Sequence, residues 1–265
     1  MSDSGAAAPR ITVERDGHVL LIGLNRPEKR NAADFALLQE LCLAYGELDR
    51  DPDLRVGLVF AHGDHFTGGL DLADVSPRIG PEGLEMVPEG GINPWRVDGS
   101  AVSKPVVVAV QGTCLTLGIE LMLASDIVVA ADSTTFGQIE VARGILPFGG
   151  ATIRLPGAVG WGNAMRWLLT ADTFDAAEAY RVGLVQDVVP HGQQLERALE
   201  IAHRVAAQAP LAVQATLANA RLAQADPEAA AAQLQPALVR LAATDDVRIG
   251  MQAYLSRQPA EFTGK

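Results

Sequence analysis

Two glutamates are placed where they could exchange protons with a bound carbonyl compound. Glu120 falls in the first turn of a helix expected over 117–124, and Glu140 lies between Ile139 and Val141 just before a turn rich in glycine and proline. Gathering both carboxyl groups in one apolar pocket would push their pKa values apart. That separation suits water addition or proton shuttling beside a carbonyl group. Each residue also has a plain structural interpretation, as a capping or first-turn glutamate.

Two glycine-containing segments each follow an expected strand and lead toward an expected helix. They span residues 65–72 (HFTGGLDL) and 111–120 (QGTCLTLGIE). Such turns leave backbone N–H groups without internal partners. If one N–H from each segment met at a common point, they would form an oxyanion hole. Taken singly, each segment is better explained by an ordinary strand-to-helix turn that needs glycine for a positive φ.

Other catalytic chemistries lack a starting point in this sequence. The two cysteines are too few for a disulfide framework, and Cys114 has the setting of a packed side chain. No nucleophile elbow, phosphate-binding loop or dinucleotide fingerprint occurs. The histidines do not have the spacing of metal ligands, so no metal site is expected. These histidines are His18, His62, His65, His191 and His203.

Elements that position these residues can be expected from the apolar pattern. An Asp16-Gly17 turn between two β-rich runs predicts a hairpin, and apolar spacings of three and four predict a helix within 31–50. Strands alternating with helices predict parallel β/α layers. The expected strands and helix downstream are 56–61, 106–110, 117–124 and 127–131.

Two parts of the chain differ from this alternation. Residues 73–103 hold four prolines and five glycines with little periodicity, which is typical of a functional or mobile insertion. After about residue 192, Ala-rich helical patterns follow one another over 211–224, 228–243 and 245–256. The sequence therefore predicts a β/α core over 1–192 and a helical C-terminal region over 193–265.

Composition narrows the class of protein. The chain has 265 residues and a formal net charge of −11, with 48% hydrophobic positions. No basic stripe is visible, so no nucleic-acid partner is expected. No apolar run approaches the length of a membrane helix, and no secretory signal is evident at the start, so a soluble cytoplasmic protein is expected.

Taken together, the ordered motifs resemble the crotonase superfamily, which contains enoyl-CoA hydratases and isomerases. The resemblance extends over nearly the whole chain and is closest in motif content to the hydratases. The matching segments are 24–32 (LNRPEKRNA), 66–72 (FTGGLDL), 103–106 (SKPV) with 111–112 (QG), 124–127 (ASDI), 136–140 (FGQIE), 144–150 (GILPFGG), 176–185 (AAEAYRVGLV) and 259–264 (PAEFTG).

This resemblance implies an α/β fold, a spiral of ββα turns followed by an all-helical C-terminal region used for trimer formation. It implies a homotrimer or a dimer of trimers acting on an acyl-CoA thioester, with coenzyme A as part of the substrate and no separate cofactor, as in fatty acid metabolism. The thioester oxygen would be held by the backbone N–H groups of Leu70 and Leu117. Glu120 would deprotonate water and Glu140 would protonate Cα of a trans-2-enoyl-CoA.

Departures from the family pattern leave alternatives open. Typical hydratases have three glycines where this chain has Thr116, Leu117 and Gly118. Arg143 stands three residues after Glu140, so it either pairs with that carboxylate or points outward. Isomerases of the family manage with the second glutamate alone, so an enoyl-CoA isomerase using Glu140 is one alternative. A catalytically silent acyl-CoA-binding paralogue is the other.

Substrate-binding residues are also implied by the resemblance. Coenzyme A would meet the basic pair Lys29 and Arg30 together with backbone groups of Thr67 and Gly68. Candidate apolar walls of an acyl pocket, each with packing as the competing explanation, are Met86 and Trp95 in the insertion and Phe262 in the tail.

Overall fold

A six-stranded sheet forms the centre of the molecule. The structure is a computed structural model that describes residues 8–265. The sheet has the order β1-β2-β3-β4-β6-β9; β1 pairs antiparallel with β2, and every other pair is parallel. Its strands are β1 (Ile11–Asp16), β2 (Val19–Leu24), β3 (Val56–Ala61), β4 (Val106–Val110), β6 (Ile127–Ala131) and β9 (Asp187–Val189).

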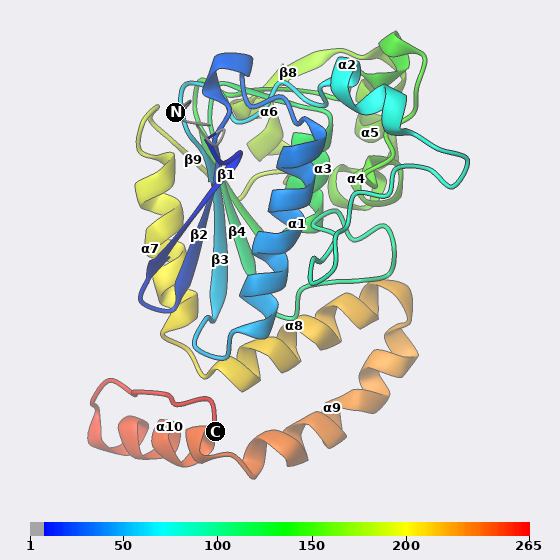
Figure 1. The fold of residues 1–265 in the computed structure, drawn as a ribbon. Helices are drawn as coiled ribbons and strands as arrows, with labels where there is room; N and C mark the ends of the chain where they lie inside the picture. Colours follow the sequence, from blue (N-terminus) through cyan, green and yellow to red (C-terminus); the bar gives the residue numbers. More distant parts are fainter. Residues whose placement is uncertain (1–7) are drawn as a thin grey trace.

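Both faces of this sheet are buried, because its strands alternate side chains between two apolar clusters. On β4, Val106 and Val108 join the cluster under α1 (Phe35–Arg50), whereas Val107 and Ala109 join the cluster under α7 (Gln194–Ala206). Figure 1 shows these two helices on opposite sides of the sheet. Near-continuous apolar strands are expected for a parallel sheet covered on both faces.

A second sheet of three short strands continues the spiral, in the order β5-β7-β8. Its strands are β5 (Thr113–Leu115), β7 (Thr135–Gly137) and β8 (Thr173–Asp175). Thr67 forms an isolated parallel bridge with Cys114, so the segment after β3 lies beside β5. This bridge brings the two glycine-containing segments together. The order of the elements along the chain confirms the alternation of strands and helices expected from the apolar pattern.

The core also contains helices and 3-10 turns that connect the strands of the two sheets. Asp34 caps α1 by accepting a hydrogen bond from the Leu37 N–H at 2.9 Å. The remaining core helices and 3-10 turns are η1 (Pro27–Lys29), α2 (Leu72–Val75), η2 (Ser76–Arg78), α3 (Leu117–Ala124), η3 (Glu140–Arg143), α4 (Ala151–Val159), α5 (Trp161–Thr170) and α6 (Ala176–Arg181). The expected insertion starts with α2 and η2 and is otherwise irregular to residue 103.

The C-terminal region contains α7 and three further helices. These are α8 (Pro210–Ala225), α9 (Pro227–Ala242) and α10 (Asp245–Ser256). Whereas α7 packs on the sheet through Ala198, Ala202 and Ala206, the other three extend away below the core in Figure 1. The division at residue 192 stays a prediction, and by packing α7 lies with the core. Over residues 8–265, no helix combines the length and apolar character needed to cross a membrane.

Candidate active site

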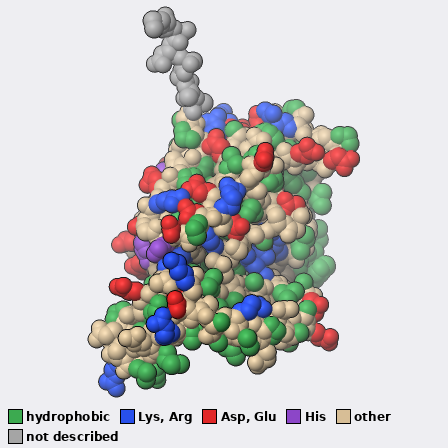
Figure 2. Space-filling view, turned by 60° about the horizontal axis from the view of Figure 1, so that its bottom comes forward, with side chains coloured by type: hydrophobic (Ala, Val, Ile, Leu, Met, Phe, Trp, Pro, Cys, Tyr) green, Lys and Arg blue, Asp and Glu red, His purple; other side chains and the backbone are tan. Residues whose placement is uncertain are grey.

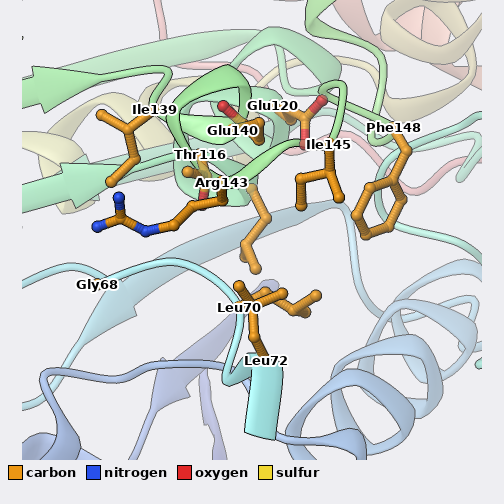
Figure 3. A pocket seen from close by; sticks show the side chains of 11 residues that line it. Gly68, Leu70, Leu72, Thr116, Glu120, Ile139, Glu140, Arg143, Ile145 and Phe148 are labelled. Atoms are coloured by element: carbon orange, nitrogen blue, oxygen red, sulfur yellow. The ribbon is translucent and has the colours of Figure 1, made fainter. Parts of the chain in front are cut away.

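A cavity of about 150 Å³ opens between the two glycine-containing segments and the η3 turn. Figure 3 shows Glu120 and Glu140 on one wall and Leu70 and Leu72 on the opposite wall. Three segments therefore supply the lining. They are 68–72, 116–120 and 139–148, with Gly68, Leu70, Leu72, Thr116, Leu117, Glu120, Ile139, Glu140, Arg143, Ile145 and Phe148 as the lining residues.

The backbone N–H of Leu70 is free because of the way its segment pairs with Ala33. The Ala33 N–H donates to the Gly69 carbonyl at 2.8 Å, and the Asp71 N–H donates to the Ala33 carbonyl at 2.9 Å. Leu70 lies between Gly69 and Asp71, and in a parallel bridge of this kind its own N–H points away from Ala33. It has no acceptor within residues 8–265.

The N–H of Leu117 is free because Leu117 begins a helix. It is the first residue of α3, and the preceding Thr116 has φ +50° and makes no side-chain cap. Across the described part of the chain this N–H has no acceptor either. The Leu115 N–H donates to the Thr67 carbonyl at 3.1 Å, which fixes the segment before Leu117 against the segment before Leu70. Two free N–H groups thus belong to adjacent segments at one cavity.

Thr116 occupies a backbone conformation that favours glycine. Its Oγ1 packs so closely on Gly69 that a Cβ added to that glycine would collide with the hydroxyl. The hydroxyl oxygen is buried and has no hydrogen-bond partner in the described structure. Thr116 therefore fills the space between the two segments that carry the free N–H groups, where the family pattern has glycine.

Glu120 is 2% exposed and meets the start of α4. Its Oε1 accepts a hydrogen bond from the Ala151 N–H at 3.1 Å. The N-cap of α4 is Gly150, which has no side chain to offer, so Glu120 takes the role of capping acceptor. Burial raises the pKa of Glu120, while the N–H groups of residues 149–151 and the positive charge of Arg154 act in the opposite direction.

Glu140 is 5% exposed and lies in a less favourable setting for a charge. Burial, with a smaller contribution from the negative charge of Glu120, raises the pKa of Glu140 to about 7. With its nitrogen turned toward Glu140, the Gln138 amide donates to Oε1 at 3.0 Å and to the Thr116 carbonyl at 3.2 Å. Gln138 therefore orients the Glu140 carboxyl group, although its hydrogen bond favours the ionised form.

Arg143 does not pair with Glu140. It is exposed, and the acceptor of its Nη1 is its neighbour's carbonyl, Ala142 O, at 3.4 Å. No carboxylate within the described residues forms an ion pair with it. Figure 3 shows its guanidinium near Gly68 and Ile139, at the opposite side of the cavity from Phe148. Of the two interpretations, the structure supports an outward-pointing charge at the rim.

A smaller apolar cavity of about 30 Å³ adjoins the first one. The two share Leu70, Leu117, Glu120 and Phe148. Met86 and Trp95 from the insertion line the smaller cavity, together with Leu38, Val97 and Gly149. The Trp95 indole N–H donates to the Leu117 carbonyl at 2.9 Å, so the insertion is attached to α3 beside the free N–H.

Of the residues expected to bind coenzyme A, Gly68 lines the cavity and Arg30 contacts Gly68. The Gly68 N–H donates to the Arg30 carbonyl at 2.7 Å. Lys29 and Arg30 are exposed, whereas Thr67 is fully buried and its hydroxyl donates to the Asn31 carbonyl at 2.7 Å. The backbone of Thr67 is also engaged, because its N–H donates to the Thr113 carbonyl at 3.0 Å and its carbonyl accepts from the Leu115 N–H at 3.1 Å. The expectation that Thr67 binds coenzyme A is therefore wrong for this structure, which leaves that residue no exposed polar group.

Phe262 is not brought to this cavity in the single chain. It packs near Gly250 of α10, and its carbonyl accepts a hydrogen bond from Arg55 at 2.7 Å. It therefore docks the tail, which was the competing expectation. A role across a subunit boundary stays a prediction.

Sequence reasoning missed the groups that support the two glutamates. Gln138 was noted as part of a motif without a role, and the turn formed by Gly149, Gly150 and Ala151 was not connected with Glu120. Arg154 was not singled out at all. A helix start preceded by two glycines and lacking a capping side chain was the available signal, because its N–H groups need an acceptor from elsewhere.

No cluster of potential metal ligands occurs among residues 8–265. His62 instead contacts the Thr12 hydroxyl at 2.8 Å, and His65 accepts from the Thr113 N–H at 3.1 Å. Both histidines hold the loops near the first glycine-containing segment.

The cavity thus combines free amides with two buried glutamates, and comparison with known proteins places the chain in a family. A family model described as enoyl-CoA hydratase/isomerase matches residues 14–265. The chain therefore belongs to the enoyl-CoA hydratase/isomerase family, as the sequence motifs indicated.

Individual relatives agree with this assignment. Enoyl-CoA hydratase EchA19 of Mycobacterium tuberculosis is 33% identical over 98% of both chains. The 2,3-dehydroadipyl-CoA hydratase of Escherichia coli is 34% identical over 96% of this chain and 99% of its own. A probable enoyl-CoA hydratase/isomerase from Mycobacterium abscessus, solved as a crystal structure, is 56% identical, covers 97% of this chain and 99% of its own, and superposes with a TM-score of 0.94. The crotonase-type α/β fold with its C-terminal helices is thereby confirmed.

Proposed function

We propose that this protein is an enoyl-CoA hydratase, which adds water across the double bond of a trans-2-enoyl-CoA thioester. One observation carries the proposal: two buried glutamates in unlike environments share a cavity with two unpaired backbone N–H groups. The hydratases among its relatives support the same class of reaction. Coenzyme A belongs to the substrate, and the reaction needs no other cofactor.

Unlike environments suit the two glutamates to different roles. Burial raises the pKa of Glu120, but its N–H hydrogen bond and the charge of Arg154 favour the ionised form, so we assign Glu120 as the base. Glu140 has a pKa raised to about 7 by burial, so it holds a proton near neutral pH and serves as the acid. Water addition requires one group of each kind.

The proposed reaction balances as follows. Glu120 takes a proton from water while the oxygen bonds to Cβ, and the electrons of the double bond move into the thioester to form an enolate. The N–H groups of Leu70 and Leu117 hold the enolate oxygen. Glu140 then donates its proton to Cα as the carbonyl group re-forms.

Substrate binding follows from the two ends of the cavity. The acyl chain enters the smaller apolar cavity lined by Met86 and Trp95. At the opposite rim, Arg143 offers positive charge to the phosphates of coenzyme A, together with the exposed pair Lys29 and Arg30, of which Arg30 contacts Gly68. Because the net charge is −11, this local group rather than the whole molecule attracts the anionic substrate.

The test is a panel of enoyl-CoA thioesters of increasing chain length, followed by loss of enoyl absorbance. We expect the wild-type protein to hydrate 2-enoyl-CoAs, and Glu120→Gln and Glu140→Gln each to lower kcat by about 10²- to 10⁴-fold. Conversion of 3-enoyl-CoAs without hydration, spared by Glu120→Gln and lost in Glu140→Gln, would instead identify an isomerase. Tight binding of acyl-CoA without turnover of any thioester would identify a silent paralogue.

A further inference from the structure

Arg154 on α4 is a half-buried cation without a paired carboxylate. Its Nη2 donates to the Arg96 carbonyl at 2.9 Å and its Nη1 to the Gly149 carbonyl at 3.4 Å. No ion pair involves it within the described chain. A guanidinium cannot shed its proton in a protein, so burial without a counter-charge is costly. A nearby negative charge would offset this cost, and the carboxylate that acts electrostatically on Arg154 is Glu120.

The turn at Gly149–Gly150 is held between Arg154 and Glu120. A Cβ added to Gly149 would lie 2.5 Å from Glu120 Oε2 and 3.0 Å from Trp95 Cδ1. A Cβ added to Gly150, whose φ is +105°, would collide with Arg154 Nη1. The carboxylate therefore packs on one side of the turn and the guanidinium packs on the other.

The two contacts of this turn are connected through its backbone. Arg154 binds the carbonyl of Gly149, and Glu120 accepts from the N–H of Ala151, two residues further on. The second guanidinium contact, to the Arg96 carbonyl, ties the same turn to the insertion that carries Trp95. Moving Arg154 would thus release the donors that hold Glu120.

Other charged groups around Glu120 do not replace this one. Glu140 lies on the same wall of the cavity, and its carboxyl group, when ionised, would carry a charge of the same sign as Glu120. Arg96 donates to the Ala124 carbonyl at the far end of α3, and Arg221 on α8 is paired with Asp126 at 3.0 Å. Within the described structure, Arg154 is left as the cation directed at Glu120.

We propose that Arg154 is a positioning residue for Glu120, which fixes the turn of residues 149–151 around the carboxylate and supplies the positive charge that favours its ionised form. The inference rests on the proposed role of Glu120 as the base of hydration. It adds a residue outside the cavity lining to the machinery of the site.

The experiment compares Arg154→Met, which removes both charge and hydrogen bonds, with Arg154→Lys, which keeps the charge alone. We expect Arg154→Met to lower kcat for a 2-enoyl-CoA by about 10- to 100-fold at neutral pH, with KM within about threefold, because Glu120 is less often ionised and less well oriented. The acidic limb of the pH profile of kcat/KM should move upward by about one pH unit. Arg154→Lys should return the acidic limb to its wild-type pH, because the positive charge is kept. Its kcat should stay at least about threefold below wild type, because an amine cannot bind both carbonyls as the guanidinium does.

Controls make the result specific. Arg166→Met, on the exposed face of the neighbouring α5, removes an arginine outside the site and should leave kcat and the pH profile unchanged. Thermal unfolding shows whether each variant is folded. If Arg154→Met does not fold, the test rests on Arg154→Lys. A kcat of Arg154→Lys equal to that of wild type would then show that Arg154 does not position the turn of residues 149–151. A folded Arg154→Met with an unshifted limb and kcat within twofold of wild type would overturn the whole proposal.

A measurement independent of turnover separates this inference from the proposed function. Infrared difference spectroscopy can follow ionisation of the Glu120 carboxyl group, with Glu120→Gln identifying its band. If the wild-type protein hydrates no enoyl-CoA, the proposed function fails. Arg154→Met must still shift the Glu120 titration upward for the link between Arg154 and Glu120 to stand.

Discussion

At the scale of single residues, the site depends on groups held in costly states. Glu140 is buried, and the pKa of its carboxyl group is raised from 4.5 to about 7 by that burial. Thr116 combines a left-handed φ with a buried hydroxyl that has no partner in the described structure. Both features cost folding free energy, and such costs concentrate at functional sites. Their presence at one cavity supports a catalytic role for it.

The raised pKa of Glu140 makes stability depend on pH in a predictable direction. Below its ordinary pKa, Glu140 is protonated in both the folded and the unfolded chain. Between 4.5 and about 7 the unfolded chain loses this proton first, so the contribution of Glu140 to the free energy of unfolding falls as pH rises through this range. The loss is complete above about pH 7 and can reach about 3 kcal/mol.

Glu140→Gln removes this titration, and we expect it to be more stable than wild type at pH 8 but close to wild type at pH 4.5. Urea unfolding at the two pH values measures the difference. The exposed Glu89→Gln serves as the control and should change stability equally at both values. An unchanged pH dependence in Glu140→Gln would mean that Glu140 is readily ionised in the folded protein. The same variant should lose hydration, which shows that stability and activity oppose each other at this residue.

At the scale of elements, chain topology brings the site together. The segment after β3 bridges to β5, and the insertion returns over α3 through the Trp95 hydrogen bond to Leu117. Consequently this irregular insertion contributes Met86, Trp95 and Val97 to the wall of the small cavity that we propose for the acyl chain. Loops that line a rigid framework commonly set specificity.

Met86 in this loop is expected to limit acyl chain length. Its half-buried side chain lines the small apolar cavity, so Met86→Ala enlarges the cavity without emptying the core. We expect the ratio of kcat/KM for an eight-carbon over a four-carbon 2-enoyl-CoA to rise about tenfold. Val87→Ala is the matched control, because Val87 is exposed and outside the cavity lining. An equal ratio in both variants would place the acyl chain elsewhere.

The sequence predicted the elements well because apolar periodicity determines them locally. The strands 56–61, 106–110 and 127–131 and the helix 117–124 have the predicted bounds. Glu120, Glu140, Leu70 and Leu117 were also singled out, through the family motifs, and the structure gathers them at one cavity. The support of Glu120 by the start of α4 could not be predicted, because it joins residues 31 positions apart through backbone N–H groups that carry no sequence signal.

At the scale of the whole molecule, the three helices after α7 cannot be explained as part of the core. Among the residues of α8, α9 and α10, only Ala230 of α9 and Asp246 of α10 are buried. In Figure 2, hydrophobic side chains (green) lie exposed over the lower part of the face that is turned forward. Helices without a buried apolar face gain little from packing and are marginal in water alone. An apolar surface of this kind is expected to be covered by another chain.

We therefore expect the protein to assemble as a trimer or a dimer of trimers through these helices, with the C-terminal region folded fully only in the assembly. Light scattering coupled to gel filtration should give three or six copies of the 27.9-kDa chain. The double variant Leu234→Asp/Leu238→Asp puts charges on one exposed apolar face of α9 and should shift the protein to a smaller species, whereas Gln233→Asp adds a charge to another face and should not. Because assembly contributes to folding, the unfolding temperature of wild type should rise with protein concentration and that of the double variant should not. A monomeric wild type whose unfolding temperature is independent of concentration would show that these helices are stable on their own.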